Sequence, residues 1–205
     1  ATLLPILFVA NKNAPFKTFE EFKAYAKAHP GKARIGITNA PSSLQIGMTH
    51  LIKDLAKLDV QLVEQPDGPV RGTIDCLIGD TDALISHPPD IMRYIRRGDF
   101  VPLATFAPER LAMLPDVPAA AEAGLPNYEA YSWTALFAPA KTPQAVLDKI
   151  NADFNTAFKD PAVRQRLLDG GAETAPGTQQ EMRDFLRAEI AKWAKVIKTA
   201  GITTG

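Results

Sequence analysis

The sequence predicts an α/β fold with a mostly parallel sheet, and two observations support this prediction. Apolar runs of strand length alternate with amphipathic windows of helical spacing between residues 5 and 106. Turn signals such as Pro30-Gly31 and Asp67-Gly68 separate these runs. An alternation of strands and helices is typical of a parallel sheet with helices on its faces.

The expected elements of this first part follow in order. Strands are predicted at 5–11, 33–37, 60–65, 81–86 and 100–106, because each run is apolar and short. Thr18 and Glu21 form a capping box for a first helix that ends before Pro30. Ser42 or Ser43 can cap a second helix over 44–58, and further helices are predicted at 68–79 and 88–98.

The composition changes after residue 106. Residues 107–130 are rich in proline and predict a loop with one short Ala-rich helix, followed by a strand that starts at 131. Three helices then begin at Thr142-Pro143, at Asp160-Pro161 and at a capping box formed by Thr178 and Glu181. This part has too few strands for a sheet of its own, so the apolar faces of its helices need another surface.

Length and composition limit the classes of function. The chain has 205 residues, of which 46% are hydrophobic, enough for one large domain or two small ones. Basic and acidic residues balance at 23 each, which argues against a nucleic-acid partner. No apolar run is long enough to span a membrane, and the N-terminus lacks the basic start of an intact signal peptide, although one could have been cleaved. The single cysteine, Cys76, excludes an internal disulfide and is expected in the core.

Polar segments follow three of the predicted strands. Loops at the carboxyl ends of parallel strands converge on a crevice, and the N–H groups at the start of a helix can hold a small anion. The same residues also fit plain structural roles, since serines often only cap helices and Asp-Gly is most often a turn. The candidate ligand-binding residues are Thr38, Asn39, Ala40, Ser42, Ser43, Gln45, Asp67, Gly68, Ser86 and His87.

No catalytic or metal-binding motif is evident. The sequence lacks a G-x-S-x-G elbow, an H-E-x-x-H pair and a P-loop. His29 and His50 lie in helical contexts without partners at metal-ligand spacing. We therefore expect a protein that is not an enzyme and that needs no cofactor.

From about Leu7 onward the chain resembles the substrate-binding proteins of tripartite tricarboxylate transporters, also called Bug or TctC-like receptors. The most specific part is LPDVPAAAEAGLPNYEAYSWTALFAPAKTP, from Leu114 to Pro143, which is similar to the family's Leu-Pro-Asp-Val-Pro, Glu-Ala-Gly, Trp and Phe-Ala-Pro pattern. The stretches 26–32 and 160–173 and the end of the last helix resemble family motifs too.

The resemblance implies a periplasmic receptor that captures a small carboxylate and presents it to a membrane permease. It implies a fold like that of type II periplasmic binding proteins, with one complete, mostly parallel α/β lobe at 8–128. Residues 1–7 and 129–205 would then supply crossing strands and C-terminal helices of an incomplete second lobe. Trp133 falls where the chain crosses again between the two lobes. The resemblance therefore adds Trp133 to the candidate ligand-binding residues.

Several positions depart from the family pattern. Asn39 and Pro41 stand where the family loop usually has glycines, and Gln45 replaces a histidine. Asp67 replaces the lysine of a Pro-Tyr-Lys-Gly motif. The N-terminal segment of relatives is also missing from this sequence, which suggests a truncated derivative with altered or lost binding and a homo-oligomer or swapped assembly.

Two other functions fit the sequence. Effector-sensing domains of transcription regulators use a similar fold, but normally follow a helix-turn-helix. An interaction protein that kept the fold and lost the ligand is the second alternative.

Overall fold

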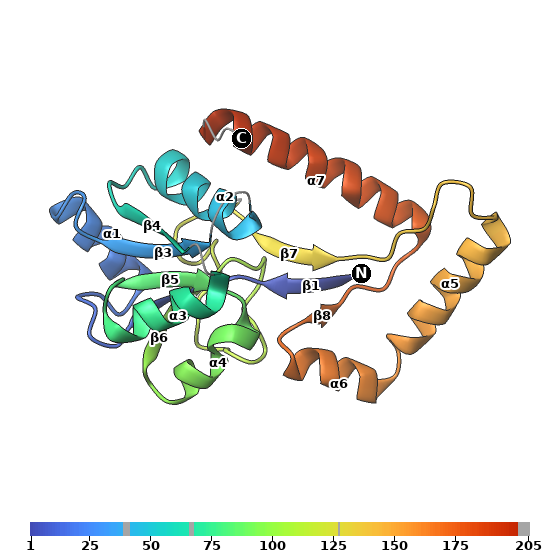
Figure 1. Cartoon of the computed structure of the whole chain (residues 1–205), viewed down its shortest axis with the longest axis horizontal. Helices are drawn as coiled ribbons and strands as arrows, with labels where there is room; N and C mark the ends of the chain where they lie inside the picture. Colours follow the sequence, from blue (N-terminus) through green and yellow to red (C-terminus); the bar gives the residue numbers. More distant parts are fainter. Residues whose placement is uncertain (39–41, 66–67, 127, 201–205) are drawn as a thin grey trace. The chain divides into compact units, whose positions relative to one another are not determined.

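The computed structural model describes residues 1–38, 42–65, 68–126 and 128–200. The chain divides into two compact units (Figure 1). The smaller unit contains Ala1–Leu4 and Ser132–Lys195, and the larger contains Pro5–Tyr131 and Val196–Gly205. The assignment of 8–128 to a family lobe stays a prediction.

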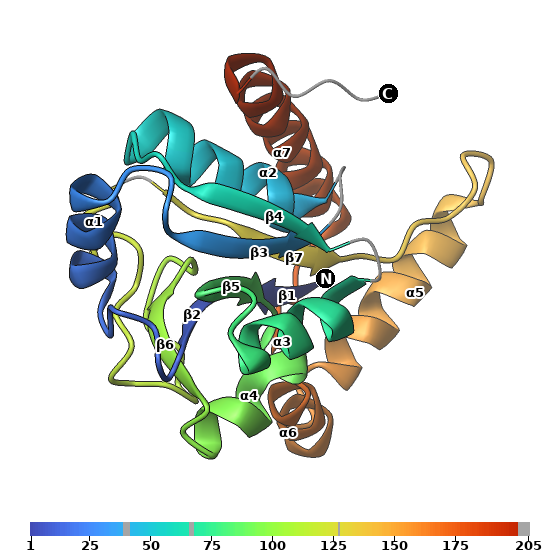
Figure 2. The same cartoon turned by 60° about the vertical axis from the view of Figure 1, so that its left-hand side comes forward.

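A five-stranded sheet forms the centre of the larger unit (Figure 2). Its order is β4-β3-β5-β2-β6, with β2 at Leu7–Asn11, β3 at Arg34–Thr38, β4 at Gln61–Gln65, β5 at Ala83–Ser86 and β6 at Phe100–Thr105. Strand β3 runs parallel to β4 and β5, whereas β2 lies antiparallel to β5 and β6. Four strands therefore share one direction, as predicted, and β2 is reversed. The reversal was not predictable because all residues of β2 are buried, and a strand buried on both faces carries no signal of direction.

Helices α1 (Phe19–Ala28), α2 (Ser43–Thr49), α3 (Gly68–Ile78) and α4 (Pro88–Arg96) belong to this unit. The prediction of one α-helix over 44–58 is wrong in its second half, where α2 passes into a π-helical segment, η1 (His50–Leu55). The N–H of Ala56 donates to the carbonyl of Leu51 at 2.8 Å, one residue farther back than in an α-helix. Leu55, the last residue of this segment, is 43% exposed.

The predicted Ala-rich helix is also wrong. Between 119 and 125 the chain forms hydrogen-bonded turns, with the N–H of Ala123 donating to Ala119 and that of Leu125 donating to Ala120. Gly124 adopts φ +82°, which ends the helical path after about one turn.

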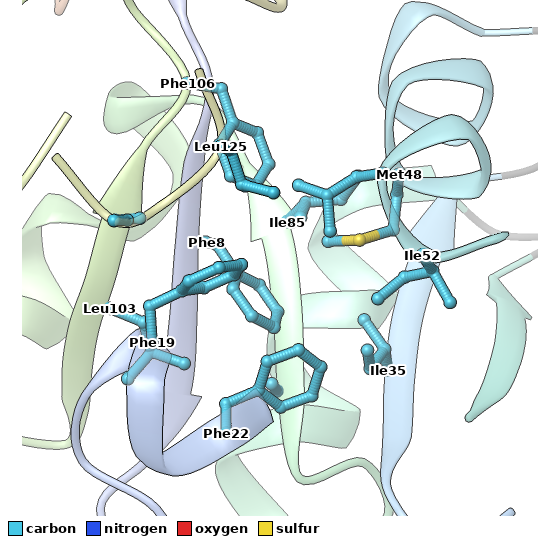
Figure 3. Close-up of a cluster of buried hydrophobic side chains, with 14 of the residues drawn as sticks. Phe8, Phe19, Phe22, Ile35, Met48, Ile52, Ile85, Leu103, Phe106 and Leu125 are labelled. Carbon is cyan, nitrogen blue, oxygen red and sulfur yellow. The ribbon is translucent and has the colours of Figure 1, made fainter. Parts of the chain in front are cut away.

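Buried side chains cover both faces of the sheet. On one face, aromatic and aliphatic residues from α1, α2, η1 and the sheet pack together, among them Phe8, Phe22, Ile35 and Met48 (Figure 3). The rings of Phe8 and Phe22 lie 5.0 Å apart in an edge-to-face arrangement. The other face packs against α3 and α4 through a smaller cluster that includes Cys76, whose predicted burial is confirmed.

The smaller unit has a three-stranded sheet in the order β7-β1-β8 and long helices (Figure 1). Its elements are β1 (Thr2–Pro5), β7 (Tyr131–Thr134), α5 (Gln144–Ala157), α6 (Pro161–Asp169), β8 (Glu173–Thr174) and α7 (Gln179–Ala200), some of which extend past the unit boundary. Helices α5 and α6 contain no buried residue. Val146 and Phe154 on α5 are 46% and 47% exposed, which agrees with the predicted shortage of core in this part.

The predicted helix starts are confirmed at two of three positions. The carboxylate of Asp160 accepts the N–H of Ala162 at 2.7 Å. Thr178 and Glu181 form a reciprocal capping box. The remaining helix, α5, starts one residue later than predicted. Pro143 occupies its N-cap position, and the helix has no side-chain cap because a proline offers no hydroxyl or carboxylate. Among the described residues, no helix combines the length and the apolar character needed to cross a membrane.

Candidate ligand-binding site

The predicted polar segments begin at one edge of the five-stranded sheet. Strands β3, β4 and β5 are parallel, so their carboxyl ends face the same way. The register places Thr38 opposite Gln65, and it pairs Gly36 with Leu84, each two residues before the end of its strand. Helices α2, α3 and α4 each start just beyond this edge (Figure 2).

The first segment leads into α2. Ser42 is its N-cap, and its Oγ accepts the N–H of Gln45 at 3.1 Å, so the predicted capping role is confirmed. Ser43 is the first residue of the helix. The side chain of Thr38 and the whole of Asn39 and Ala40 lie outside the described residues.

Gln45 has a buried side chain at the mouth of α2. Its Nε2 donates to Oε1 of Glu64 on β4 at 3.4 Å, which orients the amide because a carboxylate can only accept. Its Oε1 is buried and has no hydrogen-bond partner. A donor from a ligand or from water would satisfy this oxygen.

The second segment leads into α3. Asp67 lies outside the described residues, whereas Gly68 is the first residue of α3 and adopts φ +79°. A positive φ favours glycine, so this residue allows the chain to turn sharply from β4 into the helix.

The third segment is less suited to an anion. Oγ of Ser86 donates to the Asp90 carboxylate at 3.2 Å, and Asp90 places a negative charge in the first turn of α4. The two prolines that begin α4 have no N–H to donate. Nδ1 of His87 lies 3.0 Å from the carbonyl of Pro5, which assigns the proton to Nδ1 and leaves Nε2 as an acceptor in the neutral ring.

Trp133 belongs to the smaller unit, whereas the other candidates belong to the larger one. Its Nε1 donates to Oε2 of Glu189 at 3.3 Å, and its ring packs edge to face against Phe185 at 5.4 Å. The polar atom of this indole is therefore used within its own unit.

Gln65 is a further polar residue that the sequence reasoning missed. It is the last residue of β4, the residue is only 3% exposed, and its Nε2 has no hydrogen-bond partner. Its signal in the sequence was a glutamine closing an apolar strand directly before Pro-Asp-Gly.

The described residues hold no cluster of side chains able to bind a metal ion. Burial raises the pKa of Cys76 to about 12, so its thiol stays protonated near neutral pH and is a poor nucleophile.

The fold is that of the type II periplasmic binding proteins. The family model described as "Tripartite tricarboxylate transporter family receptor" matches residues 2–202, and the chain belongs to this family.

Two curated relatives illustrate the similarity. Protein BugT of Bordetella pertussis is 29% identical over 203 residues, which cover 97% of this chain and 60% of the relative. A UPF0065 protein of Agrobacterium vitis, from the TAR-I ttuE-ttuC' intergenic region, is 30% identical over 98% of this chain and 58% of its own. The chain thus spans about three fifths of the length of these relatives.

Solved structures show the same similarity. "R. palustris Rpa4515 with adipate" superposes with a TM-score of 0.85 at 28% identity, over 98% of this chain and 66% of the other. "MatC (Rpa3494) from Rhodopseudomonas palustris with bound malate" gives a TM-score of 0.76 at 29% identity, over 96% and 67%. The periplasmic binding protein BugD shares the fold, with a TM-score of 0.83 at 21% identity over 100% and 68%.

Proposed function

We propose that this protein is a periplasmic solute-binding receptor that captures a small carboxylate for uptake by a membrane permease and does no chemistry on it. The observation that carries this proposal is the common edge of β3, β4 and β5, where helices α2 and α3 begin. The candidate contacts are Thr38, Asn39, Ala40, Ser42, Ser43, Gln45, Asp67 and Gly68, with Ser86 and His87 beside them.

An acid group fits this edge for electrostatic reasons. Helix N-termini carry partial positive charge and present N–H groups to an anion without needing lysine or arginine. Helix α2 continues without interruption into η1, so the helical run behind Ser42 extends from Ser43 to Leu55. Helix α3 is reached through the turn at Gly68.

The named ligands of two relatives support the choice of ligand class. Adipate and malate both carry two carboxylates, and the proteins named with them are 28% and 29% identical to this chain. From these two ligands we infer only the class of ligand for this chain, a small organic acid. Glu64 adds negative charge beside Gln45, and Asp67 stands where the family motif has a lysine, so the ligand or its affinity should differ from those of relatives that carry the lysine.

Isothermal titration calorimetry with a panel of small acids tests the proposal. The panel contains mono- and dicarboxylates, hydroxy acids and aromatic acids, and the matched control contains their neutral amides. Binding of at least one acid, and of no amide, is the expected result. If well-folded protein binds no member of the panel, the receptor proposal is wrong.

Trp133 is tested separately, because it lies in the other unit. If it also contacts the ligand, a Trp133→Phe variant should bind the best acid of the panel at least several-fold more weakly. Unchanged affinity would remove Trp133 from the site.

We further propose that the chain forms a homo-oligomer or a swapped assembly. The support is the exposed apolar surface of the smaller unit, where Leu136, Phe137, Phe154 and Ile190 are each between 47% and 62% exposed. Apolar side chains exposed in this number favour association. Sedimentation at micromolar concentration should give a mass above that of one chain, and a monomeric mass would contradict the proposal.

A further inference from the structure

Strand β4 forms one edge of the five-stranded sheet. Among the described strands it pairs only with β3, and the two run parallel. The N–H of Gln61 donates to the carbonyl of Ala33, on the β3 side, at 2.8 Å. Because the hydrogen-bonding groups of successive residues alternate between the two sides of a strand, the N–H and C=O groups of Leu62 and Glu64 point away from β3. An edge of this kind can accept a further strand.

A groove of about 580 Å³ opens beside this edge, where η1 ends and β4 begins. Lys53 and Lys57 line it with two positive charges and Asp59 with one negative charge, and both lysines are exposed. The groove therefore carries a net positive charge next to an apolar wall. The wall consists of Ile52, Leu58, Val60 and Leu62.

Glu64 lies on the same face of β4 as this groove. Side chains two residues apart on a strand share a face, and Leu62 packs against the core cluster that contains residues of α2 and η1. Glu64 is exposed near the carboxyl end of the strand, whereas the two lysines flank its start. The edge thus carries opposite charges at its two ends. This pattern is complementary to an antiparallel copy of itself.

We propose that two copies of this chain associate edge to edge through β4, antiparallel and centred on Val63. In this register Leu62 lies opposite the partner's Glu64, and the outward-facing backbone groups of each such pair exchange both of their hydrogen bonds. The partner's Glu64 then lies on the face of the groove and meets its lysines. A register centred on Glu64 would instead set like charges opposite each other, which is unfavourable.

This interface belongs to the larger unit and uses none of the exposed apolar residues of the smaller one. It depends neither on the identity of the ligand nor on the proposed receptor function.

Disulfide trapping tests the register. In a Val63→Cys variant the new thiols form a directly opposed pair, whose Cα atoms lie about 4.5 Å apart and suit a disulfide. In Gln61→Cys, on the same face of β4, the thiols lie about four residues apart, roughly 13 Å, which is too far. Cys76 is buried and should react in neither variant. Mild oxidation should link only Val63→Cys into dimers. Faster linking of Gln61→Cys, or no linking of either variant, would overturn the proposal and leave the edge to another occupant.

Charge reversal tests the contact between the carboxylate and the lysines. Glu64→Lys, and the pair Lys53→Glu with Lys57→Glu, should each weaken the dimer roughly tenfold or more, because two-fold symmetry repeats the contact. The three changes together restore opposite charges and should restore the dimer. Arg96→Glu, an exposed reversal on α4 across the sheet, is the control. Sedimentation over a range of concentrations measures all of these constants. An unchanged constant in Glu64→Lys, or no recovery in the combined variant, would contradict the interface.

Hydrogen exchange of the wild-type protein provides a measurement even if a variant does not fold. The N–H groups of Leu62 and Glu64 face solvent in a single copy and are bonded in the dimer, so exchange in β4 should slow as the protein concentration rises. Exchange in β6, at the other end of the strand order, should not depend on concentration. Exchange in β4 that is equally independent of concentration would overturn the proposal, whatever mass the protein shows in sedimentation.

Discussion

Nε1 of Trp193 lies 2.9 Å from Oε2 of Glu189, and the same carboxylate oxygen accepts the indole N–H of Trp133 at 3.3 Å. These are the only tryptophans of the chain, and Glu189 is 6% exposed. Both indoles of the protein thus report on one buried carboxylate that ties β7 to α7 within the smaller unit.

Replacing Glu189 with alanine should therefore change the fluorescence and the stability together. Both indole N–H groups lose their acceptor, and the loss of hydrogen bonds to a buried charged group costs about 1.5–3 kcal/mol of unfolding free energy. Emission spectra and urea unfolding measure the two effects. Asp184→Ala, on an exposed part of the same helix, should change neither appreciably. An unaltered emission spectrum in Glu189→Ala would contradict the hydrogen bonds.

Gly68 and Gly98 form a matched pair for testing the ligand site. Their φ angles are +79° and +74°, and a Cβ at either position would meet no atom within 4 Å. Alanine at either position should lower the free energy of unfolding by about 1 kcal/mol, because both backbones lie in the left-handed region. Only Gly68→Ala should weaken binding of the best acid ligand. If the same cost of about 1 kcal/mol falls on the bound conformation, the affinity should fall roughly fivefold.

Calorimetry on both variants separates strain from function. Equal affinities of Gly68→Ala and Gly98→Ala would show that the start of α3 does not touch the ligand. A loss of affinity in Gly98→Ala would show instead that any local destabilisation reduces binding.

The strands of the larger unit were predictable because most of them are apolar runs bounded by turn residues. Burial, which sets that pattern, does not record strand direction, so the reversal of β2 was not predictable. The π-helical segment η1 was not predictable either. Met48, Leu51 and Ile52 are all buried at α-helical spacing, so the apolar pattern carries no sign of the wider turn that follows.

The candidate site was predictable only in part. The carboxyl ends of β3, β4 and β5 could be placed together because the alternation of elements implies parallel strands. The roles of Gln65 and Trp133 could not be predicted, because their surroundings come from distant parts of the chain. Trp133 bonds to a residue 56 positions later, and Gln65 faces glycines of β3 and α3.

The exposed carboxylate of Glu64 should oppose the binding of an anion. Glu64→Gln removes this charge and should raise the affinity for a dicarboxylate by roughly two- to fivefold at low salt, since exposed charges interact by less than about 1 kcal/mol. Titrations at low and high ionic strength should show the gain shrinking with salt. Glu109→Gln, at an exposed loop position, is the control. Weaker binding in Glu64→Gln would indicate that Glu64 acts mainly by orienting Gln45.

Stability should fall at alkaline pH because two buried groups resist ionisation. Burial raises the pKa of Cys76 from an ordinary value of 9.0 to about 12. Burial also raises the pKa of Tyr128, whose hydroxyl donates to the carbonyl of Gly47 at 2.8 Å. A raised folded pKa means that the stabilisation is complete below the unfolded pKa and is lost as the pH rises toward the folded value.

For Cys76, that loss should begin near pH 9 and approach about 1.4 kcal/mol per pH unit below pH 12, since one proton is released on unfolding. Urea unfolding between pH 7 and 11 measures the slope. Cys76→Ala should be less stable at every pH, because it leaves a cavity in the core, but its stability should decline less steeply above pH 9. A thiol reagent should react with the wild-type protein only as fast as the protein unfolds. Rapid labelling of the native protein at pH 8, or an identical slope in Cys76→Ala, would contradict a protonated and enclosed thiol.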